Sequence, residues 1–573
     1  MQRSFRLPRR NLLALLTATL CFSCSAPDPR REPTTAPVLP PSLVLIGRVR
    51  TMDARLPEAE AVLVRDGKIM RATTAAEAMA AAVPSTRVVR IPEGAVILPG
   101  LIESHAHLRG VGRAGREVDL TGTTSIADAL ARIAAAAETQ SGSAWIVGRG
   151  WNQERWTEKR WPTAAELDLV TKGRPAYLAR VDGHAAWVNT EALKLSGVDG
   201  GTNPGPGGEI LKGADGSPLG VLIDDAMGLV GSRAEGRLNT ELMERDFLRG
   251  QEEAFRQGIT TFVDAGDSYL ALLTLLKLYD ADRMKLRVYG LAGVSTAAEL
   301  VEVLARPIVV DHRDRFTVRA LKLYADGALG SRGAALLSPY ADRPDAKGLD
   351  VATPDFLRRV ADRCLERGWQ MCVHAIGDRA NRNVLDAMAA ALKDRPAKDH
   401  RFRIEHAQLL DPADVPRFAA LGVIPSMQPC HATSDFTWAA DRVGPLRLAQ
   451  TGYVWRDLLE TGAIIPSGTD APVEPLSPFQ NFYAAVVRRD PQGRATATFA
   501  PEQRMNRYEA LAAATIWGAR ATFTEDRRGM IAPGFDADLC VVSHDLMTVA
   551  EEALLKARCL LTVVAGETVY ESP

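Results

Sequence analysis

The sequence predicts an α/β protein, a (β/α)8 TIM-type barrel with a small β-sandwich domain formed by both chain ends. Two observations lead to this fold class. Short strand-like runs occur at both ends of the chain, and between them apolar runs alternate with helical stretches over residues 99–525. Alternating β and α elements are typical of a parallel sheet, and the barrel is its closed form. A chain of 573 residues has room for more than one domain.

Composition and charge exclude several classes of protein. Hydrophobic residues make up 46% and charged residues 24%, which is typical of a folded soluble protein. The 69 Lys and Arg residues balance 70 Asp and Glu residues to a net charge of -1, so nucleic acid is not an expected partner. Of seven cysteines, Cys21 and Cys24 have the only CxxC spacing and lie near the N-terminus. We therefore expect neither a disulfide scaffold nor a cysteine-based zinc site.

Residues 1–24 have the order of an export signal, a basic start followed by a short apolar run and small residues. Arg9-Arg10 fits either an ordinary basic region or a twin-arginine signal. Cys24 is a candidate for lipidation, and export without a lipid is the alternative. Residues 25–41 are rich in Pro, Thr and Arg and predict a tether. The protein is expected in the periplasm, as a membrane-anchored lipoprotein or outside the cell, with no membrane contact other than a lipid at Cys24.

Residues 42–98 and 526–573 are predicted to form the β-sandwich together, because each block is too small for a core of its own. Asp66-Gly67 stands between two apolar runs, which is a strong hairpin signal. Residues 99–525 are assigned to the barrel, with an insertion at about 143–250 that is irregular and rich in Trp, Gly and Pro. Helices are expected at 355–367, 379–393 and 507–521.

Two histidines follow the first strand-like run of the barrel. His105 and His107 are alternate residues, and alternate residues of a strand point to the same face. At the carboxyl end of a barrel strand that face opens into the active-site mouth. Two unrelated surface histidines are the alternative for so short a motif.

Four further residues end later strand-like runs. Lys322 lies within an apolar run, where an ammonium is costly to bury. A lysine whose ammonium extends to solvent, or one that pairs with an acid such as Asp326, is the alternative. His374 and His406 lie at strand ends, where a hydrogen-bonded structural histidine is the alternative. Asp470 lies on a turn and would otherwise be a turn residue. Taken together, the nitrogen and carboxylate donors predict one site, suited to Zn2+ or a related divalent ion.

The order His-x-His, Lys, His, His, Asp resembles the amidohydrolase superfamily. Within it, the chain is similar to the amidohydrolase-3 branch, the YtcJ-like proteins that include N-substituted formamide deformylase. The resemblance runs from residue 43 to residue 570, and its motifs are PGLIESHAHL, GWNQERW, VDGHAAWVN, ALKLYADGALGSRGAAL, CVHAIGDRAN, RIEHAQLL and PSGTDAPVEP. It implies a barrel beside a small β-sandwich, as the pattern of elements also predicts.

The resemblance also implies a metal site and its ligands. His105 and His107 would hold one metal ion, and His374 and His406 a second one. Lys322 would bridge the two as a carboxylated lysine, because a carbamate supplies negative charge where an ammonium would be repelled. The expected cofactor is a divalent metal, one or two ions per chain, with Zn2+ favoured by the nitrogen and oxygen donors.

Asp470 would be a metal ligand and the general acid and base. The implied reaction is cleavage of a linear amide or N-formyl C–N bond in a small-molecule substrate by a metal-activated hydroxide. A deaminase, a cyclic amidohydrolase or an esterase on the same site is an alternative. A noncatalytic exported ligand-binding barrel is another, although a binding protein has no need of the general base at Asp470.

Three residues are candidates for binding substrate. Trp151 belongs to a tryptophan cluster that would line an aromatic pocket or pack the core of the insertion. His184 is expected to reach the site. Arg332 would bind a carboxylate or carbonyl group, or brace its glycine-rich turn. His431 is expected to be peripheral. The other tryptophans of the cluster are Trp156, Trp161 and Trp187.

Overall fold

The structure is a computed structural model that describes residues 39–139, 145–205, 207–234, 239–397, 399–491, 493 and 497–573. Residues 41–573 form one compact unit. The expected export signal with Cys24, and nearly all of the expected tether, lie outside the described residues. None of the described helices combines the length and the apolar character that crossing a membrane requires.

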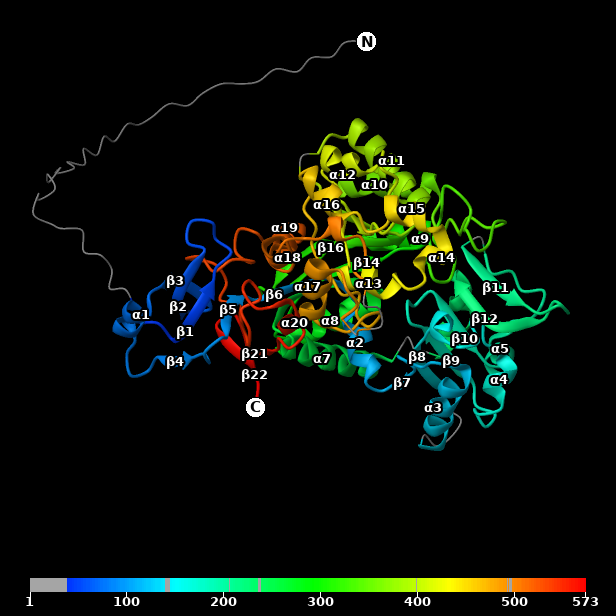
Figure 1. Ribbon diagram of the computed structural model, residues 1–573, viewed down its shortest axis with the longest axis horizontal. Helices are drawn as coiled ribbons and strands as arrows, with labels where there is room; N and C mark the ends of the chain where they lie inside the picture. Colours follow the sequence, from blue (N-terminus) through cyan, green and yellow to red (C-terminus); the bar gives the residue numbers. More distant parts are fainter. Residues whose placement is uncertain are drawn as a thin grey trace, which may run out of the picture. The chain divides into compact units, whose positions relative to one another are not determined.

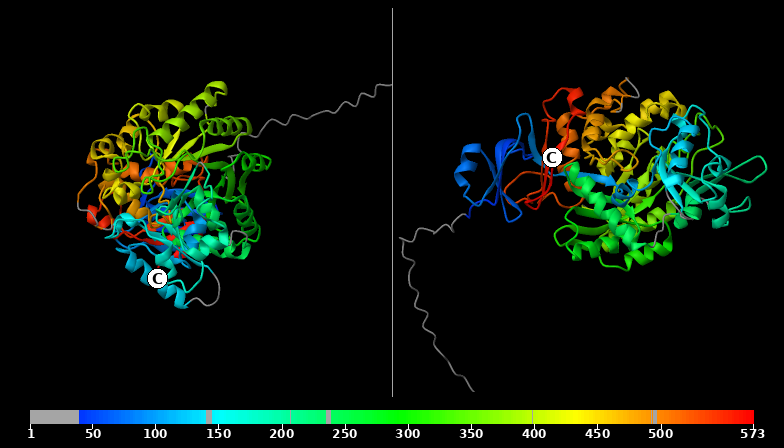
Figure 2. Two further views of the ribbon diagram at one scale, coloured as in Figure 1. Left: turned by 90° about the vertical axis from the view of Figure 1, so that its right-hand side faces the viewer. Right: turned by 90° about the horizontal axis from the view of Figure 1, so that it is seen from below.

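Strands from both ends of the chain pair in one eight-stranded sheet (Figures 1 and 2). The strands are β1 (Leu43–Arg50), β2 (Glu58–Arg65), β3 (Lys68–Thr73), β4 (Arg87–Arg90), β5 (Val96–Pro99), β20 (Leu539–Val542), β21 (Cys559–Val564) and β22 (Glu567–Glu571). The two ends meet where β5 pairs antiparallel with β20. Asp66 and Gly67 have φ of 50° and 73°, the backbone that a two-residue hairpin turn requires. The expected pairing of the ends is present, and a separate domain stays a prediction.

Seven parallel strands form a nearly closed barrel. In spatial order they are β6 (Leu101–Ala106), β13 (Ile259–Asp267), β14 (Arg287–Gly293), β16 (Phe316–Tyr324), β17 (Gln370–Ala375), β18 (Arg403–His406) and β19 (Ile424–Ser426), with β15 (Val309–His312) antiparallel to β16. The remaining gap holds an irregular segment near Pro466. Met427 N donates to Pro466 O at 3.1 Å, and Ser104 N donates to Ser467 O at 3.2 Å. Both edges of the sheet therefore bond to this segment.

Helices cover the barrel. The expected helices at 355–367 and 379–393 are confirmed as α10 (Pro354–Arg367) and α11 (Asp378–Asp394). Thr353 caps the start of α10 by accepting from Phe356 N, and Gly368 ends the helix at φ 73°. The other helices of the barrel and the C-terminal region are α2 (Leu108–Ala114), α7 (Thr240–Arg256), α8 (Tyr269–Asp280), α9 (Ala297–Leu304), α12 (Val415–Leu421), α13 (Pro429–Asp435), α14 (Ala439–Val443), α15 (Pro445–Thr451), α16 (Trp455–Glu460), α17 (Pro478–Val487) and α20 (Glu551–Leu554).

The expected helix at 507–521 is wrong as a single element. It is divided into α18 (Arg507–Ala513) and α19 (Ile516–Ala521). The carbonyl oxygens of Ala513 and Ala514 accept hydrogen bonds from Ser467 N and Ile102 N of the barrel. Since these carbonyls bind the barrel backbone, they are not used to continue the helix.

A second sheet of six strands is inserted between β6 and β13. It consists of β7 (Val118–Asp119), β8 (Ile146–Trp151), β9 (Ala176–Arg180), β10 (Ala185–Val188), β11 (Gly208–Lys212) and β12 (Pro218–Asp224), with α3 (Ile126–Thr139), α4 (Ala164–Asp168), α5 (Thr190–Ser196) and α6 (Gly228–Ala234). The sheet begins before the expected start of the insertion. The end of the expected insertion is barrel helix α7, which packs so closely on α2 that a Cβ at Gly112 would lie 1.8 Å from Asp246 O.

Candidate active site

A cavity of about 530 Å³ opens at the carboxyl ends of the barrel strands. Each of the six residues that the sequence assigns to the metal site lines it: His105, His107, Lys322, His374, His406 and Asp470. They come from β6, from His107 at the start of α2, from β16, β17 and β18, and from the segment in the barrel gap. One face of the inserted sheet completes the wall with Tyr177, Ala179 and His184. The structure thus brings together residues that are up to 365 positions apart in the chain.

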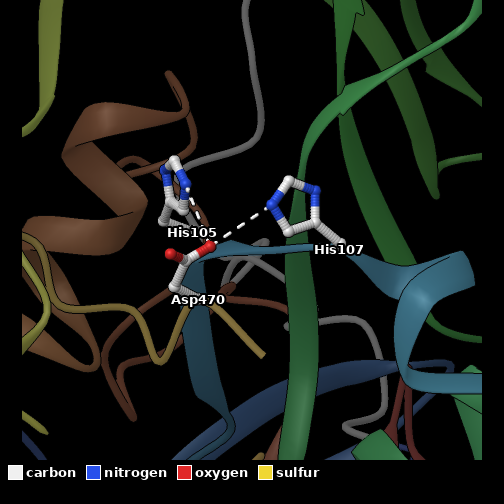
Figure 3. A group of neighbouring side chains, drawn as sticks. All are labelled: His105, His107 and Asp470. Atoms are coloured by element: carbon white, nitrogen blue, oxygen red, sulfur yellow. Dashed lines mark ion pairs between the residues drawn. The ribbon is translucent and has the colours of Figure 1, made fainter. Parts of the chain in front are cut away.

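Asp470 stands between the two histidines of the HxH motif (Figure 3). Its Oδ1 lies 3.5 Å from His105 Nε2 and 3.3 Å from His107 Nε2. Asp470 N also donates to His105 O at 2.7 Å, which fixes the carboxylate beside the motif. Asp470 has a φ of 58°, a conformation that non-glycine residues rarely adopt and that often marks a functional site.

The other oxygen of Asp470 faces a second pair of histidines. Asp470 Oδ2 lies 3.6 Å from His431 Nε2, and the rings of His431 and His406 are stacked with centroids 5.8 Å apart. The expectation that His431 is peripheral is therefore wrong. His431 lies in α13, which begins at Pro429, and not at the end of a strand, so it has no strand-end signal in the sequence. His406, His431 and Asp470 form one group of nearby ligand atoms, and His105, His107 and Asp470 form another.

The donor atoms in these two groups fit a divalent metal ion. His105 Nε2, His431 Nε2 and Asp470 Oδ1 are buried and have no hydrogen-bond partner among the described residues. Burial lowers the pKa of His105 and, more strongly, that of His406, so both rings are neutral at neutral pH and offer a lone pair. Orphaned buried polar atoms are costly, and nitrogen and carboxylate donors are the ligands that Zn2+ takes.

His105 is oriented from behind by Glu405. The Nδ1 atom of His105 is 2.6 Å from Glu405 Oε2, and Arg403 donates to both oxygens of Glu405 at 2.8 and 2.9 Å. Burial would raise the pKa of Glu405, but the charge of Arg403 and the hydrogen bond with His105 hold it below its ordinary value. The carboxylate therefore stays charged and directs Nε2 of His105 toward Asp470. Glu405 directly precedes His406 in the sequence, but no local pattern indicates that it meets His105, so this partner was missed.

Lys322 and His374 lie on neighbouring strands at the floor of the cavity. Lys322 is buried, with Nζ 4.3 Å from the centre of the Tyr324 ring, and it forms no ion pair with any described residue. The alternative of a pair with Asp326 is not observed; Asp326 accepts instead from the backbone N–H groups of Ile376, Gly377 and Ala335 at 2.8–3.0 Å. The centroid of the His374 ring is 4.6 Å from that of His406.

His184 reaches the cavity from the insertion, as expected. Its ring centroid lies 4.9 Å from that of His374. Its Nδ1 is 2.6 Å from Asp224 Oδ1. Burial would lower the pKa of His184, but the contact with Asp224 raises it above its ordinary value. Asp224 has a φ of 48°, and a Cβ at Gly327 would lie 2.2 Å from its Oδ2. The glycine-rich loop after β16 thus leaves room for the Asp224 carboxylate.

Trp151 and Arg332 do not line the cavity. Trp151 is fully buried in the core of the insertion, where its indole N–H donates to Leu178 O at 2.7 Å and its ring stacks on Trp156. Arg332 donates to both carboxylate oxygens of Asp342 and braces its own loop. We therefore correct both assignments as substrate contacts. In each case the competing structural role, which the sequence left open, is the one observed.

Comparison with known proteins agrees with this geometry. Residues 93–570 match the family model described as the amidohydrolase family. The YtcJ protein of Bacillus subtilis (strain 168), which is named as an amidohydrolase, is 31% identical to this chain, and the alignment covers 92% of this chain and 98% of YtcJ. N-substituted formamide deformylase of Arthrobacter pascens is 27% identical over 92% of this chain and 98% of its own. The crystal structure of an uncharacterized metal-dependent hydrolase from Pyrococcus horikoshii superimposes with a TM-score of 0.72 at 26% identity, covering 89% of this chain and 99% of that one. The chain therefore belongs to the amidohydrolase family of metal-dependent hydrolases.

Proposed function

We propose that the protein is an exported hydrolase that cleaves a linear amide or N-formyl C–N bond. The observation that carries this proposal is the convergence of four histidines, Lys322 and Asp470 on one cavity, with orphaned ligand atoms between them. The similarity to a formamide deformylase supports the choice of bond. The basic and apolar start of the chain supports export to the periplasm, with Cys24 as the site of a lipid anchor.

Divalent ions would be held by His105, His107 and Asp470, and by His374 and His406 with Lys322 as a carboxylated bridge; His431 extends this ligand set. Such ions polarise a carbonyl group and lower the pKa of a water molecule. We favour zinc because the donors are imidazole nitrogens and carboxylate oxygens. Lys322 suits the bridging role because it is buried in the cavity without an acidic partner.

Asp470 is the proton-transfer group of the proposal. Its two oxygens face opposite groups of histidines, so the carboxylate borders the space between them. From there it takes a proton from the attacking water and gives it to the departing nitrogen. Glu405 keeps His105 in position throughout.

Elemental analysis together with a substrate screen tests the proposal. Protein prepared without chelator should contain one or two divalent ions per chain and should release amine from at least one N-formyl or N-acyl amine. Chelation should abolish this activity, and Zn2+ should restore it. A metal-free protein with full activity would overturn the proposed mechanism, and a metal-loaded protein that cleaves only esters or cyclic amides would overturn the choice of bond.

A further inference from the structure

Arg149 lies on the wall that the inserted sheet adds to the cavity. In the β8–β9 register Arg149 is paired with Ala179, and Val147 with Tyr177. Side chains alternate along a strand, so Arg149 points to the same face as Ala179 and Tyr177. All three line the cavity, whereas Leu178 between them packs in the tryptophan core on the other face. The guanidinium is therefore presented to the active site by a rigid strand.

Arg149 differs in charge pairing from the two other arginines of the cavity. Arg109 is 3.1 Å from an oxygen of Asp267, and Arg113 is 2.8 Å from an oxygen of Glu117. Arg149 has no carboxylate partner among the residues that the structure describes. Of the three cavity arginines, Arg149 is thus the one whose guanidinium has no ion pair among the described residues, and a carboxylate of a ligand would supply one.

A single backbone contact orients the guanidinium. Arg149 Nη2 donates to Val181 O at 3.0 Å, and the group has further N–H donors for a ligand. Burial and then the charge of Arg113 lower the pKa of Arg149 to about 10, so it remains a cation at neutral pH. The charges of Glu117, Asp470 and Asp182 raise the pKa of Arg149 and so act in the opposite sense.

We propose that Arg149 binds a carboxylate of the substrate, and that the preferred substrates are amides carrying one carboxylate. This inference rests on the proposed amide hydrolysis and specifies its substrate class. The scissile group would face Asp470 and the histidines, while the carboxylate would face the inserted sheet. A guanidinium suits this role because it can donate two parallel hydrogen bonds to a carboxylate.

Matched substrate pairs test this proposal. Racemic N-formyl derivatives of alanine, leucine and phenylalanine are each compared with the N-formyl amine that lacks only the carboxylate. The wild-type enzyme should show the higher kcat/KM for the acid in at least one pair. Arg149→Gln should lower the ratio of the two kcat/KM values at least about thirtyfold, as expected when one partner of a buried charge contact is lost. Arg149→Lys should give a ratio between those of the wild type and Arg149→Gln, because lysine keeps the positive charge but cannot donate two parallel hydrogen bonds to a carboxylate.

Arg233→Gln is the matched control, since it removes the same charge from an exposed position on α6. Its ratio should equal that of the wild type, and all variants should match in metal content and melting temperature. Equal preference of the wild type for acid and neutral compound, or an unchanged ratio in Arg149→Gln, would overturn the carboxylate site.

The two proposals can fail separately. If the wild type cleaves none of these compounds, calorimetry with the same pairs measures binding directly. Tighter binding of the acid that is lost in Arg149→Gln would support the carboxylate site while the amide-hydrolase proposal is not supported. Equal affinities of the wild type for both members of every pair would overturn the carboxylate site as well.

Discussion

Asp470→Asn is the substitution that most directly tests the proposed chemistry. Asp470 is buried, and its oxygens lie 3.3 Å from His107 Nε2 and 3.6 Å from His431 Nε2. Asparagine has nearly the same shape and keeps one oxygen, so the local packing should survive. What the variant loses is the negative charge and the ability to accept a proton from water.

The expected loss follows from this difference. A positioned acid or base contributes about 10² to 10⁴ in rate. We expect at least about a hundredfold loss of kcat on an amide, which is about 2.7 kcal/mol in barrier height. The loss on an activated ester should be smaller, because its leaving group departs without a proton. The departing nitrogen of an amide needs a proton, and we expect Asp470 to deliver this proton.

The assay measures kcat for an amide and an activated ester of the same acyl group, with wild type, Asp470→Asn and a control. Asp345→Asn serves as the control, since Asp345 is exposed and is not among the residues that line the cavity. Metal content is determined for each protein, so that loss of a ligand is separated from loss of proton transfer. Equal losses on both substrates would refute the leaving-group role, and full activity of Asp470→Asn would refute the role of Asp470 altogether.

Three further predictions follow from the buried contacts. Lys322→Ala should abolish activity and lower metal content, with partial rescue by acetate, whereas Lys322→Arg should stay inactive because guanidinium cannot be carboxylated; a fully active Lys322→Arg enzyme would make this lysine structural. Glu405→Gln should weaken metal binding about 10- to 100-fold, measured by competition with a chelator, because His105 loses its orienting carboxylate; unchanged affinity would contradict this. Asp536→Asn should lower the free energy of unfolding by roughly 3 to 5 kcal/mol at pH 7, because buried Arg528 loses the carboxylate that accepts from its Nε at 2.8 Å. Burial would raise the pKa of Asp536, but the charges of Arg287 and Arg528 lower it below its ordinary value. This stabilisation is therefore present above about pH 4 and is lost as the pH falls further. Urea titrations from pH 7 to pH 3 should show the free energies of unfolding of the wild type and the variant converging.

The sequence by itself determined the order of elements and most of the candidate site. His105, His107, Lys322 and His374 each lie at or just after an apolar strand, and parallel strands of a barrel end at the same rim. Local patterns were therefore sufficient to bring these side chains to one cavity. The Asp66-Gly67 turn was predictable for the same reason, since its conformation depends on two adjacent residues.

Only the tertiary structure decided between roles that depend on distant partners. Glu405 meets His105 across 300 residues of sequence, and no local pattern encodes such a contact. His431 reaches Asp470 only through the placement of a helix, and Trp151 could pack or bind until its neighbours were known. The physical reason is the same in each case. A short motif fixes which face a side chain takes, whereas the packing of separate elements fixes what that side chain meets.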